Sequence, residues 1–98
     1  MATVNSIPIT HLCVHYQADT DFFNALQEYE LVEIIQVEQV PCIPMEQIKD
    51  VETLVHLHYD LNINLEGLDV ISHLLTKMQE LHQELSQVKS RLRGYELR

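Results

Sequence analysis

The sequence predicts a mainly α-helical protein: a winged helix-turn-helix head followed by a long coiled-coil helix. Three observations predict this. Two short segments with helical apolar spacing lie near the N-terminus, a β-branched segment ending in prolines follows them, and the last third of the chain carries an uninterrupted heptad pattern. A chain of 98 residues can bury one core. We therefore expect a head at residues 1–64 and a helix at 65–98, its first half packed on the head and its second half coiled coil.

The first two helices are short. Thr10 stands before an apolar face that contains Leu12 and Tyr16, so we expect Thr10 to cap the first helix. Asp19 is placed to cap the second. The apolar residues of the second helix fall on one side, which we expect to face the core: Phe22, Phe23, Leu26 and Tyr29. Two such helices joined by a tight turn indicate a helix-turn-helix.

Residues 31–43 are rich in β-branched side chains and predict a small hairpin, the wing. The expected turn lies near Glu38 and Gln39, although neither is the Gly or Asn that such turns favour. A third helix is predicted from Met45 to Asp60. Its inward face follows three- and four-residue spacing: Ile48, Val51, Leu54, Val55, His58 and Leu61. We expect His58 to be a core histidine with a backbone partner and His56 to lie on the surface.

The fourth helix is predicted to begin after Asn64, which is placed to cap it. Its apolar residues alternate gaps of three and four, and we call them the seam: Ile71, Leu74, Met78, Leu81, Leu85, Val88, Leu92 and Tyr95. Between Leu65 and Leu75 the apolar stripe is broader, because Leu68, Val70 and Leu75 add to it, as expected for a helix packed on a core. Beyond Met78 the stripe is narrow, which favours pairing with one other helix.

This pattern predicts a homodimer through the C-terminal helix. The expected dimerisation residues are Met78, Leu81, Leu85, Val88 and Leu92. The alternative is that the seam folds back as a lid on its own head, but nothing follows the helix that could cover its other side.

The charge is unevenly distributed. The chain has a formal net charge of −9, and residues 1–76 hold 12 acidic side chains against one basic side chain, Lys49. A face that binds duplex DNA needs several Lys and Arg side chains to neutralise phosphates. The first 76 residues cannot supply them, and their field would attract a basic partner instead.

The motifs of catalysis are missing from the sequence. Gly67 and Gly94 are the only glycines, so there is no glycine-rich phosphate loop, and no nucleophile elbow or Ser, His and Asp arrangement stands out. His11 and His15 have metal-ligand spacing around Cys13, but no carboxylate at matching spacing completes a site. We therefore expect a protein that is not an enzyme and binds no metal or cofactor.

The expected compartment is the cytoplasm. No apolar segment reaches the roughly 20 residues of a membrane span, and the N-terminus lacks a signal-peptide pattern. Cys13 and Cys42 lie in unlike contexts, so reduced thiols are expected.

The order of these elements resembles that of the MerR-type winged-helix proteins, and in particular the CbpM-type chaperone modulators. The best-matching segment runs from His58 to Leu68, reads HYDLNINLEGL and leads into Ile71. The opening ITHLC at 9–13 and Leu31-Val32 are similar as well. The resemblance covers nearly the whole chain. It implies a non-catalytic protein that binds the J-domain of a DnaJ-like co-chaperone, CbpA, and restrains its stimulation of DnaK. It also favours antiparallel pairing of the C-terminal helices.

The sequence departs from MerR-type DNA binders in charge. Those proteins carry basic residues on the second helix and the wing, where this chain has Asp21, Glu28, Glu33 and Glu38. A MerR-type DNA-binding regulator is therefore the alternative function, and an adaptor with another partner is a third. The expected partner surface is the acidic region around the hinge at Asn62, with Leu57 and Tyr59 as apolar anchors. Its acidic residues are Glu46, Asp50, Glu52, Asp60, Glu66 and Asp69.

Overall fold

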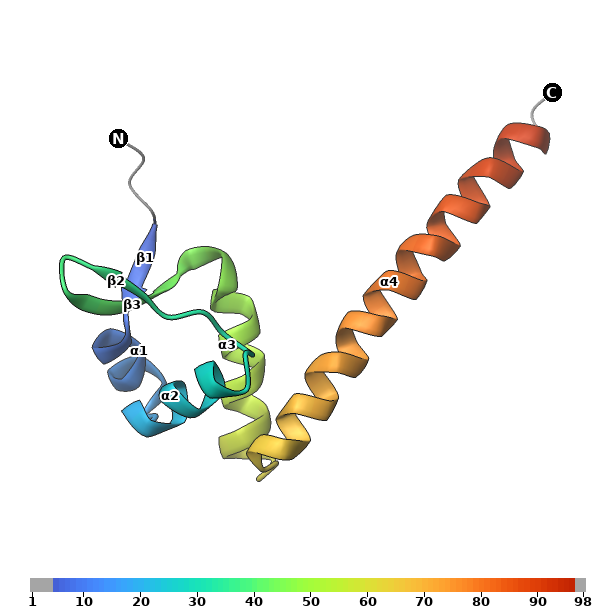
Figure 1. Ribbon diagram of the computed structural model, residues 1–98. Coiled ribbons are helices and arrows are strands. Elements are labelled where there is room, and N and C mark those ends of the chain that lie inside the picture. The colour runs from blue at the N-terminus through green and yellow to red at the C-terminus, as the bar shows by residue number, and fades with distance from the viewer. Residues whose placement is uncertain (1–4, 97–98) are drawn as a thin grey trace.

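The structure is a computed structural model that describes residues 5–96. A compact head carries a small sheet and the first three helices, and the fourth helix projects from it (Figure 1). The molecule measures 58 × 41 × 21 Å. The predicted fold class, mainly α with a winged helix-turn-helix head and a long C-terminal helix, is confirmed.

The sheet has three antiparallel strands in the order β1-β3-β2: β1 is Ser6–Pro8, β2 is Ile35–Val37 and β3 is Val40–Pro44. The predicted hairpin is formed by β2 and β3. Its two turn residues, Glu38 and Gln39, have φ values of 52° and 68°, the left-handed conformation that a two-residue hairpin turn of type I′ requires. The strand β1 was not expected, and it pairs along β3 with Ser6 opposite Pro44.

The helix-turn-helix consists of α1, Ile9–Tyr16, and α2, Thr20–Glu28. The expectation that Thr10 caps α1 is wrong, because Thr10 lies inside the helix and Pro8 occupies the position before it. The fixed φ of Pro8 ends β1 and leads directly into α1. Asp19 does precede α2 with an extended backbone, but its side chain makes no capping hydrogen bond. Phe22, Phe23 and Leu26 are buried as predicted, and Tyr29 is half-buried.

The third helical segment has the predicted bounds but three kinds of turn. A 3₁₀ turn, Met45–Gln47, precedes α3, Ile48–Val55, and a π-helical turn, His56–Asp60, follows it. In the π-helical turn the N–H of Leu61 donates to the carbonyl of His56, five residues back. The expectation that Leu61 faces inward is wrong, since its side chain is 55% exposed. The wider turn shifts the helical register, so Leu57 packs against the core instead.

The core gathers residues from every layer of the head. Among the residues that the structure describes, the largest side chains that are almost completely buried are Phe23 and Leu26 of α2, Ile43 of β3, Val51 of α3 and Leu68 of α4. The helix α4, Leu65–Glu96, thus contributes Leu68 to the core of the head. Each full burial of such a side chain stabilises the fold by about 1.5–3 kcal/mol.

The hinge between the third helical segment and α4 is held by polar contacts. Asn62 adopts a left-handed φ of 58°, which turns the chain. His58 Nδ1 lies 2.8 Å from the carbonyl oxygen of Ile63, which confirms the predicted backbone partner. The N–H of Gly67 donates to Asn64 Oδ1 at 2.8 Å, so the predicted cap at Asn64 is confirmed as well.

Contact between α4 and the head is confined to the start of the helix. Leu65 packs against the core beside Leu68, but Val70 and Leu75, which were expected against the head, are 58% and 42% exposed. Beyond Ser72 every described side chain of α4 is exposed. The division into a head at 1–64 and a two-part helix at 65–98 stays a prediction.

We expect Gly67→Ala to destabilise the fold. A Cβ at this position would lie 2.7 Å from Ile63 Cγ2 and 3.1 Å from Asn64 Oδ1, the capping atom. Such overpacking costs about 1–3 kcal/mol, more than the roughly 1 kcal/mol that alanine gains over glycine in a helix. The free energy of unfolding, measured by urea denaturation at one protein concentration, should therefore fall by up to about 2 kcal/mol.

The matched control is Gly94→Ala, because a Cβ at Gly94 would meet no atom within 4 Å. This variant should keep or raise the free energy of unfolding, since only the helix propensity changes. If both substitutions had the same effect, the close packing at Gly67 would not be what holds the hinge.

Candidate protein-binding surfaces

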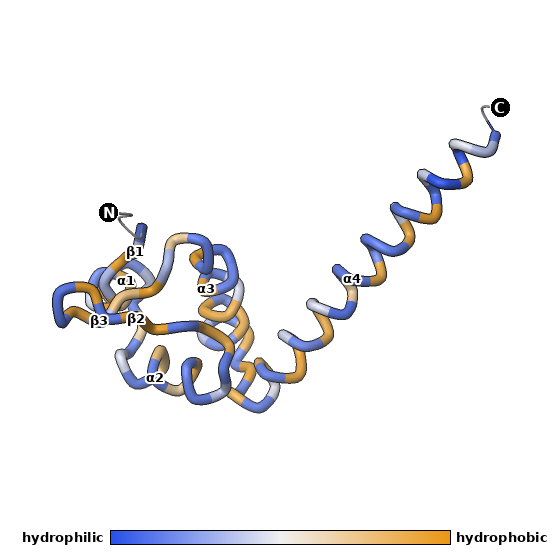
Figure 2. Tube along the Cα trace, turned by 45° about the horizontal axis from the view of Figure 1, so that its top comes forward, coloured by the Kyte–Doolittle hydropathy of each residue, from blue (hydrophilic) through white to orange (hydrophobic). Residues whose placement is uncertain are grey.

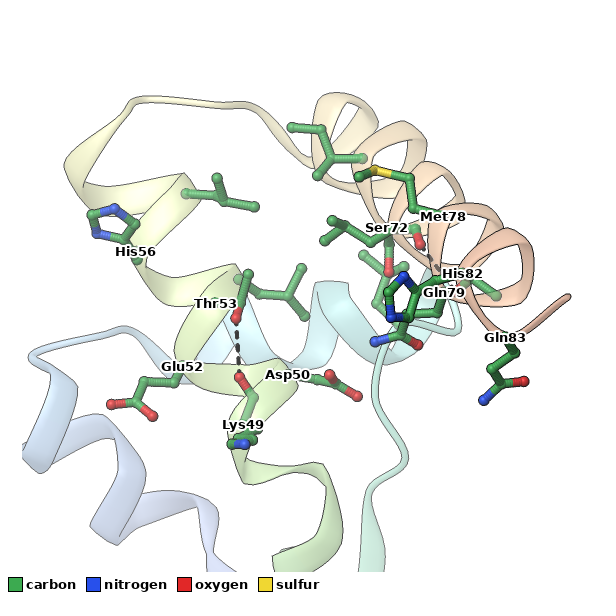
Figure 3. Close-up of a pocket in the computed structure, with 16 residues that line it drawn as sticks. Lys49, Asp50, Glu52, Thr53, His56, Ser72, Met78, Gln79, His82 and Gln83 are labelled. Carbon is green, nitrogen blue, oxygen red and sulfur yellow. Dashed lines mark hydrogen bonds between the residues drawn. The ribbon is translucent and has the colours of Figure 1, made fainter. Parts of the chain in front are cut away.

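An open groove of about 1210 Å³ separates α3 from α4 (Figure 3). Its apolar lining comes from both helices and from the loop before β2. Leu54 of α3 and Leu57 of the π-helical turn form one side, and Leu31 of the loop also lines the groove. The α4 side is formed by Ile71, Leu75 and Met78. Leu75 and Met78 are 42% and 63% exposed in the single chain, so the groove presents apolar surface to water.

Polar side chains border the groove unevenly. Asp50 points from α3 toward α4, whereas Glu52 and His56 point away from it (Figure 3). On the opposite wall His82 extends from α4 toward α3. A smaller depression that shares Leu31, Ser72 and Thr76 with the groove is also lined by Glu30. The groove is therefore an apolar surface whose charged border mixes the carboxylates of Asp50 and Glu52 with the ammonium group of Lys49.

The residues predicted to bind a partner do not form one patch. The groove is lined by Asp50, Glu52 and Leu57. Glu46 lies in the 3₁₀ turn, and Tyr59 and Asp60 in the π-helical turn. Glu66 and Asp69 lie on the first turns of α4. Leu57 is half-buried against the core, as the wider turn requires, yet it still lines the groove. The assignment of these residues to a partner stays a prediction.

Two of the acidic residues are paired with histidines on their own helical segments. Asp60 Oδ2 lies 2.6 Å from His56 Nδ1, and Asp69 Oδ1 lies 3.3 Å from His73 Nδ1. His56 and Asp60 are 61% and 65% exposed, which agrees with the surface position predicted for His56. An exposed pair of this kind contributes only about 0–1 kcal/mol, so the Asp60 carboxylate remains accessible to a partner, whereas Asp69 is half-buried.

An aromatic cluster joins α2 to the π-helical turn. The rings of Phe22 and His58 are stacked with centroids 4.6 Å apart, and Tyr59 meets both edge-on. The backbone N–H of Asp19 donates to the Tyr59 hydroxyl at 3.1 Å. Tyr59, predicted as a partner anchor, is thus also a structural contact and remains 37% exposed. Sequence spacing missed this cluster because its members come from separate segments.

The helix-turn-helix exposes acidic and not basic side chains. On α2 the carboxylates of Asp21 and Glu28 are exposed, and Glu33 and Glu38 are exposed before and within the wing.

Nearby, burial raises the pKa of the Tyr16 phenol, and the negative charge of Glu52 raises it further. Tyr16 therefore stays a neutral hydroxyl at physiological pH.

The seam of α4 is exposed along its length. The predicted dimerisation residues Met78, Leu81, Leu85, Val88 and Leu92 are between 51% and 63% exposed, and Tyr95 is 71% exposed. Figure 2 shows apolar residues recurring along α4 between polar ones, far beyond the head. So long an apolar stripe in water is typical of an interaction surface. Within the described range, no helix is long and apolar enough to span a membrane.

Comparison with known proteins identifies the family. The family model for the MerR HTH family regulatory protein matches residues 7–90, which run from β1 through the whole head and most of α4. Searches among the curated proteins and among the solved structures give no match. Because the family model covers the helix-turn-helix, the wing and the long helix described above, the chain belongs to the MerR helix-turn-helix family of regulatory proteins.

Proposed function

We propose that the protein is a non-catalytic modulator that binds the J-domain of a DnaJ/CbpA-like co-chaperone and restrains its activity with DnaK. The observation that carries this proposal is the charge of the helix-turn-helix surface. Asp21, Glu28, Glu33 and Glu38 are exposed where a MerR-type DNA binder presents basic side chains. DNA phosphates would be repelled by this surface, and a basic protein surface would be attracted to it.

The hinge supports the same proposal. The segment from His58 to Leu68, which most resembles the CbpM-type modulators, forms the junction of the head with α4 and supplies the hydrogen bonds that hold it. By the same resemblance, the second helix of a J-domain is rich in Lys and Arg. Complementary charge mainly speeds association and selects the partner, while a few buried side chains supply affinity.

A MerR-type DNA-binding regulator is the second candidate, because the matched family is described as regulatory. The two functions require partners of opposite charge, a basic J-domain or the acidic DNA backbone. Binding of the protein to each partner, measured at about 0.15 M salt, therefore distinguishes the two functions. We expect the purified protein to bind a J-domain and not random duplex DNA. Tight binding to the DNA would contradict the proposal, and binding to neither would leave an adaptor with another partner.

Charge reversal at Glu46, Asp50 and Asp60 together should slow association with the J-domain and flatten its salt dependence. All three carboxylates are exposed, so the fold should not change. Stopped-flow association at several salt concentrations measures the effect, with circular dichroism and sedimentation to verify the fold and the oligomeric state.

A second triple variant reverses Asp21, Glu28 and Glu33 on α2 and before the wing, the next acidic surface to test, and these residues are exposed as well. If only this second triple slowed association, the J-domain would contact the helix-turn-helix surface and not the region around the hinge.

We propose further that the protein is a homodimer through the seam. A two-in-seven apolar stripe that is more than half exposed suits burial against one other helix. Leu81→Asp with Leu85→Asp would place charge in that interface at a cost of several kcal/mol, and should give monomers. The head should remain folded, because α4 has left it by these positions.

Sedimentation equilibrium checks this prediction. The control adds the same two charges on the other side of the helix, with Gln87→Asp and Ser90→Asp, and should remain dimeric. A monomeric wild-type protein would contradict the seam interface.

A further inference from the structure

The three-stranded sheet has an apolar outer face. Ile7 of β1 and Ile43 of β3 are paired and pack in the core, so the neighbouring positions of each strand point away from it. None of the side chains at these outer positions carries a charge, and only Ser6 is polar. The others are apolar: Pro8, Ile35, Val37, Val40, Cys42 and Pro44.

This composition is unusual, because a small antiparallel sheet normally places apolar residues on its core face and polar residues on its outer face. Val37 and Val40 are directly paired beside the turn of the hairpin, and both are exposed. In the next row Ile35 and Pro8 flank Cys42 and are half-buried. The outer face therefore leaves apolar surface in contact with water, which is typical of an interaction surface.

Carboxylates stand at both ends of this face. Glu33 precedes β2 and Glu46 follows β3, so these two lie at one end of the antiparallel hairpin, and Glu38 lies in the turn at the other end. All three side chains are exposed. Residues 5–46 include no Lys or Arg, so no basic side chain of this segment offsets the negative charge.

We propose that the outer face of the sheet docks an amphipathic α-helix of a protein partner, whose apolar stripe is flanked by Lys and Arg. This surface is separate from the hinge and the groove. Figure 1 shows the hairpin on the side of the head opposite to the start of α4, and the residues of the outer face do not line the groove. The inference goes beyond the proposed function and does not depend on it.

The dimensions of the face suit one helix. Adjacent strands lie about 4.8 Å apart, so the distance from β1 to β2 across β3 is about 10 Å. An α-helix with its side chains is about 10–12 Å across. The five residues of β3 span about 17 Å along the strand. A single helix therefore covers most of the face, and Lys or Arg side chains beside its apolar stripe reach the carboxylates at the two ends.

The charge selects this occupant over others. Two copies of the chain that met through this face would bring Glu33, Glu38 and Glu46 of both copies together, and like charges repel. The phosphates of DNA and of anionic lipids would be repelled in the same way. A helix with basic flanks is attracted to the carboxylates and covers the apolar side chains between them.

The turn of the hairpin supports a binding role for its charge. Glu38 and Gln39 both have left-handed φ values, which cost a residue with a Cβ more than they cost Gly or Asn. Strained backbone of this kind is concentrated at functional sites. At the tip of the wing the strain keeps a carboxylate at the end of the apolar face, where Asn-Gly would give a more stable turn.

Binding is tested with a synthetic peptide of about 18 residues, with leucines at three- and four-residue spacing and lysines on both flanks of the stripe. It is titrated into the full-length protein labelled at the methyl groups of Ile and Val, and the NMR spectrum is followed. We expect shifts at Ile35, Val37 and Val40. Shifts confined to Val70 and Val88 of α4 would overturn the inference, and so would equal binding of a peptide with glutamates in place of the lysines.

The matched variants test the apolar part. Val37→Thr with Val40→Thr keeps the β-branched shape that suits a strand but replaces two methyl groups by hydroxyls. The peptide's dissociation constant, measured by fluorescence anisotropy, should rise roughly tenfold. The control is Val14→Thr on α1, an exposed valine outside the sheet, and it should bind like the wild-type protein. An unchanged dissociation constant in the double variant, at unchanged stability, would contradict the docking surface.

The turn tests the charged part in a way that separates binding from stability. Glu38→Asn with Gln39→Gly installs the favoured turn sequence, so the protein should unfold at a higher urea concentration. The same variant loses a carboxylate and should bind the basic peptide more weakly at low salt. Binding that stayed equal or became tighter would show that Glu38 takes no part in recognition.

A J-domain serves as the last probe. The Val37→Thr and Val40→Thr double variant should bind a J-domain as the wild-type protein does, because the sheet lies away from the hinge. If this variant lost J-domain binding, the J-domain itself would occupy the sheet face, and the inference of a separate partner would be wrong. If the wild-type protein bound the peptide at the sheet but no J-domain, only the proposed function would fail.

Discussion

The burial of Leu68 in the head is the contact on which the rest of the molecule depends. It belongs to the second turn of α4, and its complete burial ties the start of a 32-residue helix to the core formed by α2, α3 and β3. Asn64, the capping residue, and the close fit of Gly67 against Ile63 hold the turn that leads to it. Because the remainder of α4 leaves the head, this short region alone sets its direction, and with it the shape of the groove.

Much of the fold could be predicted because the spacing of apolar residues along the sequence indicates which side chains are buried. The stripe of α2, the β-branched hairpin, the cap at Asn64 and the heptads of α4 are local patterns, and each one appears where expected. Two features could not be predicted in this way. The strand β1 has only three residues, and it exists because β3 offers it an edge. The π-helical turn arises where a helix of regular period must also bury Leu57, so the expected inward position of Leu61 was wrong.

The candidate surfaces were less predictable than the fold. The acidity of the head follows from composition alone, but which carboxylates share a face depends on how α3 and α4 cross. Asp50 and Glu52 are two residues apart and so lie on different sides of α3, but the sequence does not say which side faces α4, and Asp50 is the one that points toward it. The sequence pointed to the groove only through Leu75. This residue widens the apolar stripe of α4, and its side chain is not covered by the head. The cluster of Phe22, His58 and Tyr59 required the tertiary structure.

The π-helical turn at His56–Asp60 has a mechanical consequence. Such a turn holds one residue more than the α-helical turn it replaces, so the chain could lose that residue and remain helical. Because the wider turn takes up the extra residue within itself, that loss would leave the residues before and after it on nearly the same faces of the helix. A deletion within α3 itself would instead rotate everything beyond it by about 100° around the helix axis, the angle that one residue covers. The π-helical turn is therefore a place where the length of the chain can change by one residue without redirecting the long helix.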